Sequence, residues 1–185
     1  MFIKLIALPG NVKECWESTY CLYFDSNCST FDCGAPNRLK RDMKHHKKPV
    51  EEILDAGGIL RRELRNDELR AVELQWLRAF ARKVKARTGQ WVLDRLKWHG
   101  FSAGYETAIE GEDALGRYSA NWQAEFLVFD EELTWGFRCQ PGPYPDFTSL
   151  KADIYVCHHN MKWTMAFTHE QPWDGPYFCE PKQNL

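Results

Sequence analysis

The residues with the clearest chemical potential lie near the end of the sequence, where His169 is followed directly by Glu170. This pair begins like the HExxH motif of zinc proteases, in which two histidines four residues apart bind the metal and the glutamate acts as a base. The second histidine is missing here, and Pro172 would interrupt the helix that the motif requires. His169 can still form an acid-base pair with Glu170 or with Asp153, or it can be a structural histidine that holds a loop to a sheet.

Metal ligands occur in the sequence, but their spacing is not that of a metal site. The C-terminal ligands are His158, His159 and His169 with Cys157 and Cys179, and the N-terminal ligands are Cys15, Cys21, Cys28 and Cys33. Zinc sites usually show closely paired ligands, and the sequence contains no CxxC pair. It also lacks the glycine-rich nucleotide motifs and the GxSxG motif of hydrolases. We therefore expect neither a metal nor a cofactor.

Acidic residues gather in the second half of the chain. Residues 1–100 carry 19 Lys and Arg against 13 Asp and Glu, a net charge of +6, whereas residues 101–185 carry 5 against 13, a net charge of −8. Two acidic groups stand out, namely Glu110, Glu112 and Asp113, and then Asp130, Glu131 and Glu132. A helix start explains the first group and a turn explains the second, so neither requires catalysis. The uneven charge predicts one basic and one acidic surface.

Two basic segments lie in the first half of the chain. The run at 38–48, RLKRDMKHHKK, has no aromatic residues between its charges for base stacking, which favours a solvated segment over a nucleic-acid site. Arg78, Arg82 and Lys85 recur at helical spacing and are typical of a solvated helix face. We therefore do not expect nucleic-acid binding, although it remains an alternative.

Periodicity predicts helices between about residues 49 and 115. The strongest helical pattern runs from about residue 67 to 87, with apolar residues at Leu69, Val72, Trp76, Leu77, Phe80 and Val84. A shorter helix begins at Pro49 and ends at Gly57, and another begins in GEDAL, residues 111–115. Residues 59–64 fit a strand or a helical turn.

Alternating apolar residues predict strands in the second part. The expected hairpins pair 124–129 with 133–138, and 153–157 with 162–168. In the last strand Trp163, Met165 and Phe167 share one face, which predicts a half-buried strand, and the same alternation predicts that His169 points towards the core. The expected fold is α+β, with a four-stranded antiparallel sheet in the C-terminal half and helices packed on one face.

Length and composition predict one soluble domain. With 185 residues and 44% hydrophobic content, we expect a single α+β domain over residues 49–185, after an extension, residues 1–48, that is part of this domain or appended to it. No signal peptide and no apolar run of membrane-spanning length is present, which predicts a cytoplasmic location. Seven cysteines at irregular spacings are typical of reduced thiols.

Several short segments occur in an order that resembles a bacterial family of unknown function, family 4275. They are WHGFS (98–102), GEDA (111–114), DIY (153–155), WT (163–164), THE (168–170) and GPYF (175–178), and the resemblance covers about residues 50–178. The family has no assigned catalytic residues, so the resemblance implies none here. Small one-domain bacterial proteins of this kind are often immunity proteins, which neutralise toxins from competing cells.

The acidic second half, with no self-consistent active site, therefore predicts an immunity-type protein that binds and neutralises the catalytic domain of a cognate toxin without catalysis of its own. The expected partner-binding residues are Glu106, Glu110, Glu112, Asp113, Asp130, Glu131, Glu132 and Trp135. One alternative is a small hydrolase that uses His169 with Glu170 or Asp153. A further alternative is a nucleic-acid-binding protein that uses the run at 38–48.

Overall fold

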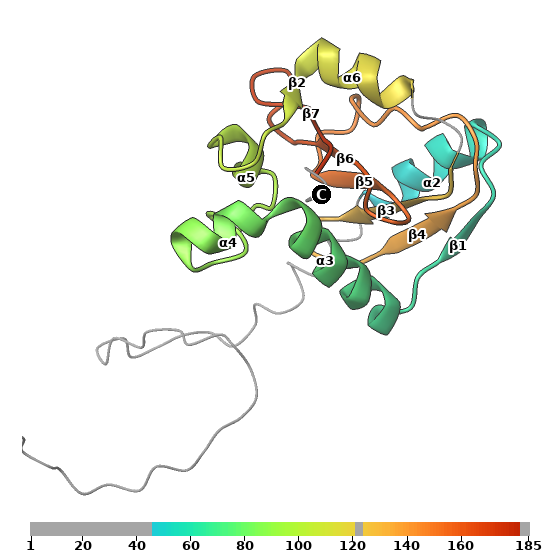
Figure 1. Ribbon diagram of the computed structural model, residues 1–185. Helices are drawn as coiled ribbons and strands as arrows, with labels where there is room; N and C mark the ends of the chain where they lie inside the picture. Colours follow the sequence, from blue (N-terminus) through green and yellow to red (C-terminus); the bar gives the residue numbers. More distant parts are fainter. Residues whose placement is uncertain (1–45, 121–123, 182–185) are drawn as a thin grey trace, which may run out of the picture. The chain divides into compact units, whose positions relative to one another are not determined.

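The computed structural model describes residues 46–120 and 124–181, which form a seven-stranded antiparallel sheet with helices on both faces (Figure 1). The strands are β1 (Arg61–Glu63), β2 (Ile109–Glu110), β3 (Phe126–Asp130), β4 (Gly136–Cys139), β5 (Ile154–His158), β6 (Thr164–Phe167) and β7 (Tyr177–Cys179). The helices are α2 (Lys47–Ala56), α3 (Asn66–Phe80), α4 (Arg82–Thr88), α5 (His99–Ser102) and α6 (Gly111–Ser119). Across the sheet the strands follow the order β1-β4-β3-β5-β6-β7-β2.

The two predicted hairpins form the centre of the sheet, but the prediction of four strands is wrong. Strands β3 and β4 pair with Phe126 opposite Cys139, and β5 pairs with β6 with Tyr155 opposite Ala166. Strand β1 adds to one side of this centre, and β7 and then β2 add to the other. These outer strands have only two or three residues each, which is too short for an alternating pattern to appear in the sequence.

The prediction of helices on one face is also wrong, because the sheet separates two hydrophobic clusters. Helices α2 and α6 pack on one face, whereas α3, α4 and α5 pack on the other. In β6, Met165 faces the first cluster and Ala166 the second, so this strand is buried on both sides rather than half-buried. The small or polar residues on the second face of β6 had suggested that this face is exposed to solvent, but helix α3 covers it. Trp76 of this helix donates its indole N–H to the hydroxyl of Thr164 at 2.9 Å.

The long predicted helix exists but is broken at Ala81, where the backbone leaves helical geometry (φ −127°, ψ 18°). Helix α4 then starts afresh, and the carboxylate of Glu106 accepts the backbone N–H of Lys83 at 2.6 Å. This contact joins residues 23 positions apart, so helical periodicity could not reveal it. Helix α4 ends at Thr88, close to the predicted end at about residue 87, and Gly89 follows it with a positive φ of 77°.

The remaining predictions on organisation are only partly open to comparison. Most of the predicted extension 1–48, including 38–45 of the basic run, lies outside the described residues. Within the described part of the chain, no helix is long and apolar enough to cross a membrane. Its three cysteines, Cys139, Cys157 and Cys179, are buried and free.

Candidate functional site

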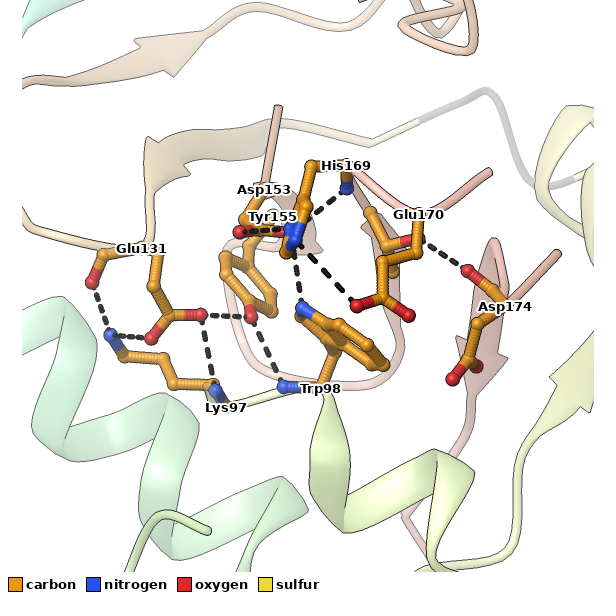
Figure 2. Close-up of polar contacts among 9 residues, drawn as sticks. Lys97, Trp98, Glu131, Asp153, Tyr155, His169, Glu170 and Asp174 are labelled. Atoms are coloured by element: carbon orange, nitrogen blue, oxygen red, sulfur yellow. Dashed lines mark hydrogen bonds and ion pairs between the residues drawn. The ribbon is translucent and has the colours of Figure 1, made fainter. Parts of the chain in front are cut away.

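His169 and Asp153 meet where strand β6 has ended and strand β5 begins. The Nδ1 atom of His169 lies 2.9 Å from each carboxylate oxygen of Asp153, whereas its Nε2 atom lies 3.7 Å from the carboxylate of Glu170. Figure 2 shows the imidazole between these two carboxylates. Of the two partners left open by the sequence, Asp153 is therefore the one hydrogen-bonded to the histidine.

The imidazole of His169 does not point into the core, which corrects the prediction from period two. Strand β6 ends at Phe167, two residues earlier, and the alternation of a strand ends with it. The side chain of His169 is 44% exposed, while that of Asp153 is 14% exposed. The pair thus places a solvent-accessible imidazole against a nearly buried carboxylate.

The carboxylate of Asp153 is fixed by donors from two directions. It accepts the backbone N–H of His169 and the indole N–H of Trp98, each at 3.0 Å. Trp98 is fully buried, and its backbone N–H donates to the hydroxyl of Tyr155 at 3.1 Å. The position of Asp153 is therefore set by core residues and not by the surface loop alone.

Behind Trp98 lies a buried charged network that consists of Lys97, Glu131 and Tyr155. The ammonium of Lys97 lies 2.8 Å from the carboxylate of Glu131, which also accepts the hydroxyl of Tyr155 (Figure 2). Glu73 lies 3.2 Å from the same ammonium. This buried network is continuous, through Trp98, with the hydrogen bonds that hold Asp153.

Burial and charge act against each other on the ionisable groups of the network. Burial raises the pKa of Glu131, although Lys97 and Tyr155 favour its ionised form. Burial also raises the pKa of Tyr155 well above its usual range. At Lys97, burial disfavours the charged form, but Glu131 and Glu73 outweigh this effect and raise its pKa. The ammonium therefore stays charged in the interior.

A pocket of about 280 Å³ opens beside the Asp153–His169 pair. Its lining residues are His46, Asp130, Glu131, Glu132, Trp135, Lys151, Ala152, Asp153, Ile154 and His169. Carboxylates thus dominate its polar wall. The pocket brings together the second predicted acidic group and the predicted histidine, which lie more than thirty residues apart in the sequence.

Residues 169–175 form a surface loop, here called the His169–Gly175 loop. At its first end His169 lines the pocket with Glu132, and at its last end the backbone N–H of Gly175 lies 3.4 Å from the carboxylate of Glu110. Figure 1 shows this loop beside β2. Between the two ends Trp173 is 90% exposed, the most exposed large hydrophobic residue described.

Four of the eight predicted partner-binding residues are exposed and lie near the two ends of this loop. Glu110 is in β2, Glu112 and Asp113 are in the first turn of α6, and Glu132 is at the pocket. Among the described residues, Glu112, Asp113 and Glu132 have no ion-pair or hydrogen-bond partner for their carboxylates. Glu112, Asp113 and Glu132 are therefore available to a partner, whereas the carboxylate of Glu110 also contacts the backbone N–H of Gly175.

The other four predicted residues have structural contacts. Trp135 is 2% exposed, and its indole N–H is buried without an acceptor among the described residues. Asp130 is buried and accepts the backbone N–H groups of Thr134 and Trp135 at 2.9 and 3.2 Å, which closes the turn after β3. Glu131 belongs to the buried network, and Glu106 pairs with Lys83 at 3.3 Å.

No group of three or more potential metal ligands comes together in the described part of the chain. His158 and His159 stack on each other at the turn after β5, with ring centroids 4.5 Å apart, and neither lines the pocket. Of the basic stripe, Lys85 folds onto the carbonyl of Gly89 and the ring of Trp91, which separates it from Arg78 and Arg82.

Residues 38–178 match the family described as Domain of unknown function (DUF4275). The chain belongs to this family. The match confirms the resemblance drawn from the short segments, and it begins within the basic run, before α2. No curated protein and no solved structure matches the chain. Membership in the DUF4275 family therefore assigns no activity, and the candidate site of this member depends on its own geometry.

Sequence reasoning missed Trp98, Lys97, Tyr155 and Trp173 as parts of the site. None of the first three belongs to a catalytic motif in the sequence, and only the tertiary fold joins them to Asp153. For Trp173 a signal was present, because a large aromatic residue in the turn sequence Gln-Pro-Trp-Asp-Gly-Pro has no strand or helix pattern to bury it.

Proposed function

We propose that this member of the DUF4275 family is a cytoplasmic protein-binding module of the immunity type, which neutralises the catalytic domain of a toxin by covering a basic surface on it. The observation that carries the proposal is Trp173, 90% exposed on a loop whose two ends lie beside exposed carboxylates. The proposed contact surface is the His169–Gly175 loop with Glu110, Glu112, Asp113 and Glu132.

An exposed tryptophan is costly unless it serves a partner. Large apolar side chains left in water lose the free energy that burial would provide, about 1.5–3 kcal/mol for a large side chain. Tryptophan is also among the residues that most often dominate the free energy of protein association. Ile109, 41% exposed in β2 beside Glu110, adds a second apolar contact near the same loop.

The exposed carboxylates near the two ends of the His169–Gly175 loop favour a basic partner. Glu112, Asp113 and Glu132 are exposed, and none is paired with a described residue. Such charges accelerate association with a partner of opposite sign and weaken it at high salt. A toxin domain that acts on nucleic acid or on another anionic substrate carries such a basic surface around its active site.

The test begins with a search of the neighbouring genes for a toxin domain, and then measures binding between that purified domain and the full-length protein, together with inhibition of the domain. Replacing Trp173 with alanine should weaken affinity at least about thirtyfold, equivalent to ~2 kcal/mol. The matched control is Leu60→Ala, which removes another exposed apolar side chain (68% exposed) next to β1, on the opposite edge of the sheet from β2. It should leave affinity unchanged.

A second variant tests the charges. Glu112→Lys combined with Asp113→Lys and Glu132→Lys should slow association and abolish its salt dependence. Glu131 is kept, since reversing a buried, paired carboxylate would unfold the protein rather than probe the surface. Absence of binding to the neighbouring toxin domain, or equal affinity of the Trp173→Ala variant and the wild type, would overturn the proposal.

A further inference from the structure

We propose that Asp153 and His169 also form an acid-base site, which activates a water molecule to hydrolyse a neutral or cationic acyl compound in the adjoining pocket. This activity needs no partner protein, although its pocket shares His169 and Glu132 with the proposed contact surface. The inference combines the geometry of the pair, the buried residues that hold it and the composition of the pocket.

The hydrogen bond to Asp153 fixes which nitrogen of His169 can act as a base. An ionised carboxylate only accepts hydrogen bonds, so Nδ1 must carry the proton in this contact. In the neutral imidazole Nε2 is then unprotonated. The nearest described carboxylate to Nε2, that of Glu170, is 3.7 Å away, which is too long for a hydrogen bond. Nε2 is thus free to take a proton.

The two carboxylates also favour the state that follows proton uptake. When Nε2 is protonated, the imidazolium lies between Asp153 at 2.9 Å and Glu170 at 3.7 Å. Opposite charges at these distances stabilise the cation as it forms. Asp153 and Glu170 therefore flank the ring that acts as the base.

The support behind Asp153 exceeds what a loop contact requires. The backbone N–H of His169 alone would tie the loop to Asp153. In addition, the indole of the fully buried Trp98 holds the same carboxylate, and Tyr155 holds the backbone of Trp98. Trp98 is therefore a positioning residue, which fixes the carboxylate and through it the imidazole.

The lining of the pocket restricts the reaction class. No described lining residue carries a hydroxyl or thiol, which excludes a serine- or cysteine-type nucleophile from this lining, and we assign the role of nucleophile to water. The lining contains four acidic residues, Asp130, Glu131, Glu132 and Asp153, together with Lys151, and Lys97 forms an ion pair with Glu131. A wall of this charge repels phosphate esters and accepts a neutral or cationic acyl group.

The step balances without a further reactant. Water gives a proton to Nε2 while its oxygen bonds to the carbonyl carbon, and the π-electron pair moves to the carbonyl oxygen. The tetrahedral intermediate then breaks its bond to the leaving oxygen or nitrogen, which takes the proton from Nε2. A carboxylic acid and an alcohol or amine are released, and His169 returns to its neutral form.

The test uses the full-length protein and p-nitrophenyl acetate, followed by release of nitrophenolate. His169→Ala should lower kcat/KM about a hundredfold or more, and added imidazole should restore turnover in this variant. Asp153→Asn should also lower kcat/KM and change the pH profile, because an amide can hold the other tautomer. Trp98→Phe should lower kcat more than it raises KM.

The matched control is His159→Ala, since His159 is a partly buried histidine outside the pocket. It should keep wild-type turnover. Folding of each variant is checked by urea unfolding, and the exposed His169 tolerates removal more readily than Trp98. Wild-type turnover no faster than that of free imidazole at equal concentration, or failure of imidazole to restore the His169→Ala variant, would overturn the inference without affecting the binding test.

Discussion

Two polar regions of this protein meet at Asp153 and differ in almost every physical respect. The buried network of Lys97, Glu131 and Tyr155 lies among core residues, and each of its charged or polar ends has a partner. The His169–Gly175 loop lies at the surface, exposes Trp173 and adjoins unpaired carboxylates. Acidic residues adjacent in the sequence, Glu131 and Glu132, belong to different regions.

The difference shows that buried charged residues contribute to stability, whereas exposed ones remain available for function. A buried charge must be paired, because an unpaired one costs several kcal/mol, and a carboxylate buried among its own donors is closed to a partner. An exposed carboxylate adds little to stability and keeps its charge available. The buried network therefore holds the site in place, and the loop and its neighbours are the surface that other molecules meet.

The largest effect on stability is expected when the cation of the buried network is removed. Lys97→Met leaves Glu131 buried without its main partner, and we expect the free energy of unfolding to fall by about 3–5 kcal/mol. Urea unfolding measures the change. Adding Glu131→Leu to this variant should restore much of the loss, because no unpaired charge then remains buried.

Arg138→Gln provides the matched control for that experiment. It breaks the ion pair with Glu125, whose two side chains are 46% and 41% exposed, and should cost no more than about 1 kcal/mol. Equal losses for Lys97→Met and Arg138→Gln would mean that burial does not separate the two regions.

Removing the hydroxyl of Tyr155 should have the next largest effect on stability. Tyr155→Phe keeps the ring but leaves the backbone N–H of Trp98 without its acceptor and removes a donor from Glu131. A buried group left unsatisfied costs about 1–3 kcal/mol, which urea unfolding would detect. An unchanged midpoint would indicate that the buried network ends at Lys97 and Glu131.

The pH dependence of stability tests Asp130, a predicted partner residue that proved to be buried. Burial raises its pKa above the ordinary value of 3.8, so its contribution to stability is fully present below that value and is lost as pH rises through the native pKa. Asp130→Asn keeps an acceptor for the turn but cannot ionise. Relative to wild type, its free energy of unfolding should rise with pH, by about 1.4 kcal/mol for each unit by which the native pKa is raised.

This comparison requires urea unfolding of both proteins between about pH 3 and pH 7. A difference that stays constant over this range would show that the carboxyl group of Asp130 titrates alike in the folded and unfolded chains.

The smallest effect on stability is expected at the centre of the loop. Trp173→Ala removes a side chain that is 90% exposed, and the free energy of unfolding should change by no more than about 0.5 kcal/mol. The same variant should still lose affinity for the partner. A large loss of stability would instead place Trp173 with the structural residues and remove it from the contact surface.

Local patterns in the sequence were sufficient where contacts are local. The hairpins of β3 with β4 and of β5 with β6 follow from alternation, and α3 follows from its apolar stripe. Strands β2 and β7 were not predicted, and β1 lies within residues 59–64, which fitted either a strand or a helical turn, because two or three residues give no measurable period. The break at Ala81 was missed because the residue that restarts the helix, Glu106, is distant in the sequence.

The candidate site was predicted only in part, for the same reason. The sequence pointed to His169 and allowed Asp153 or Glu170 as its partner, but a choice between them needed the distances. It also grouped Asp130, Glu131 and Glu132 as one acidic surface, since adjacent carboxylates look alike before burial is known. Their separation into turn, network and surface depends on contacts with Thr134, Lys97 and solvent.

The sequence by itself determined the family, the α+β class, the central hairpins and the acidic character of the second half. Each of these features follows from the composition or from the spacing of residues close together in the chain. Only the tertiary structure decided that helices cover both faces of the sheet, that Asp153 holds His169 and that Trp173 is exposed. These features depend on burial, and burial is decided by which distant segments pack together.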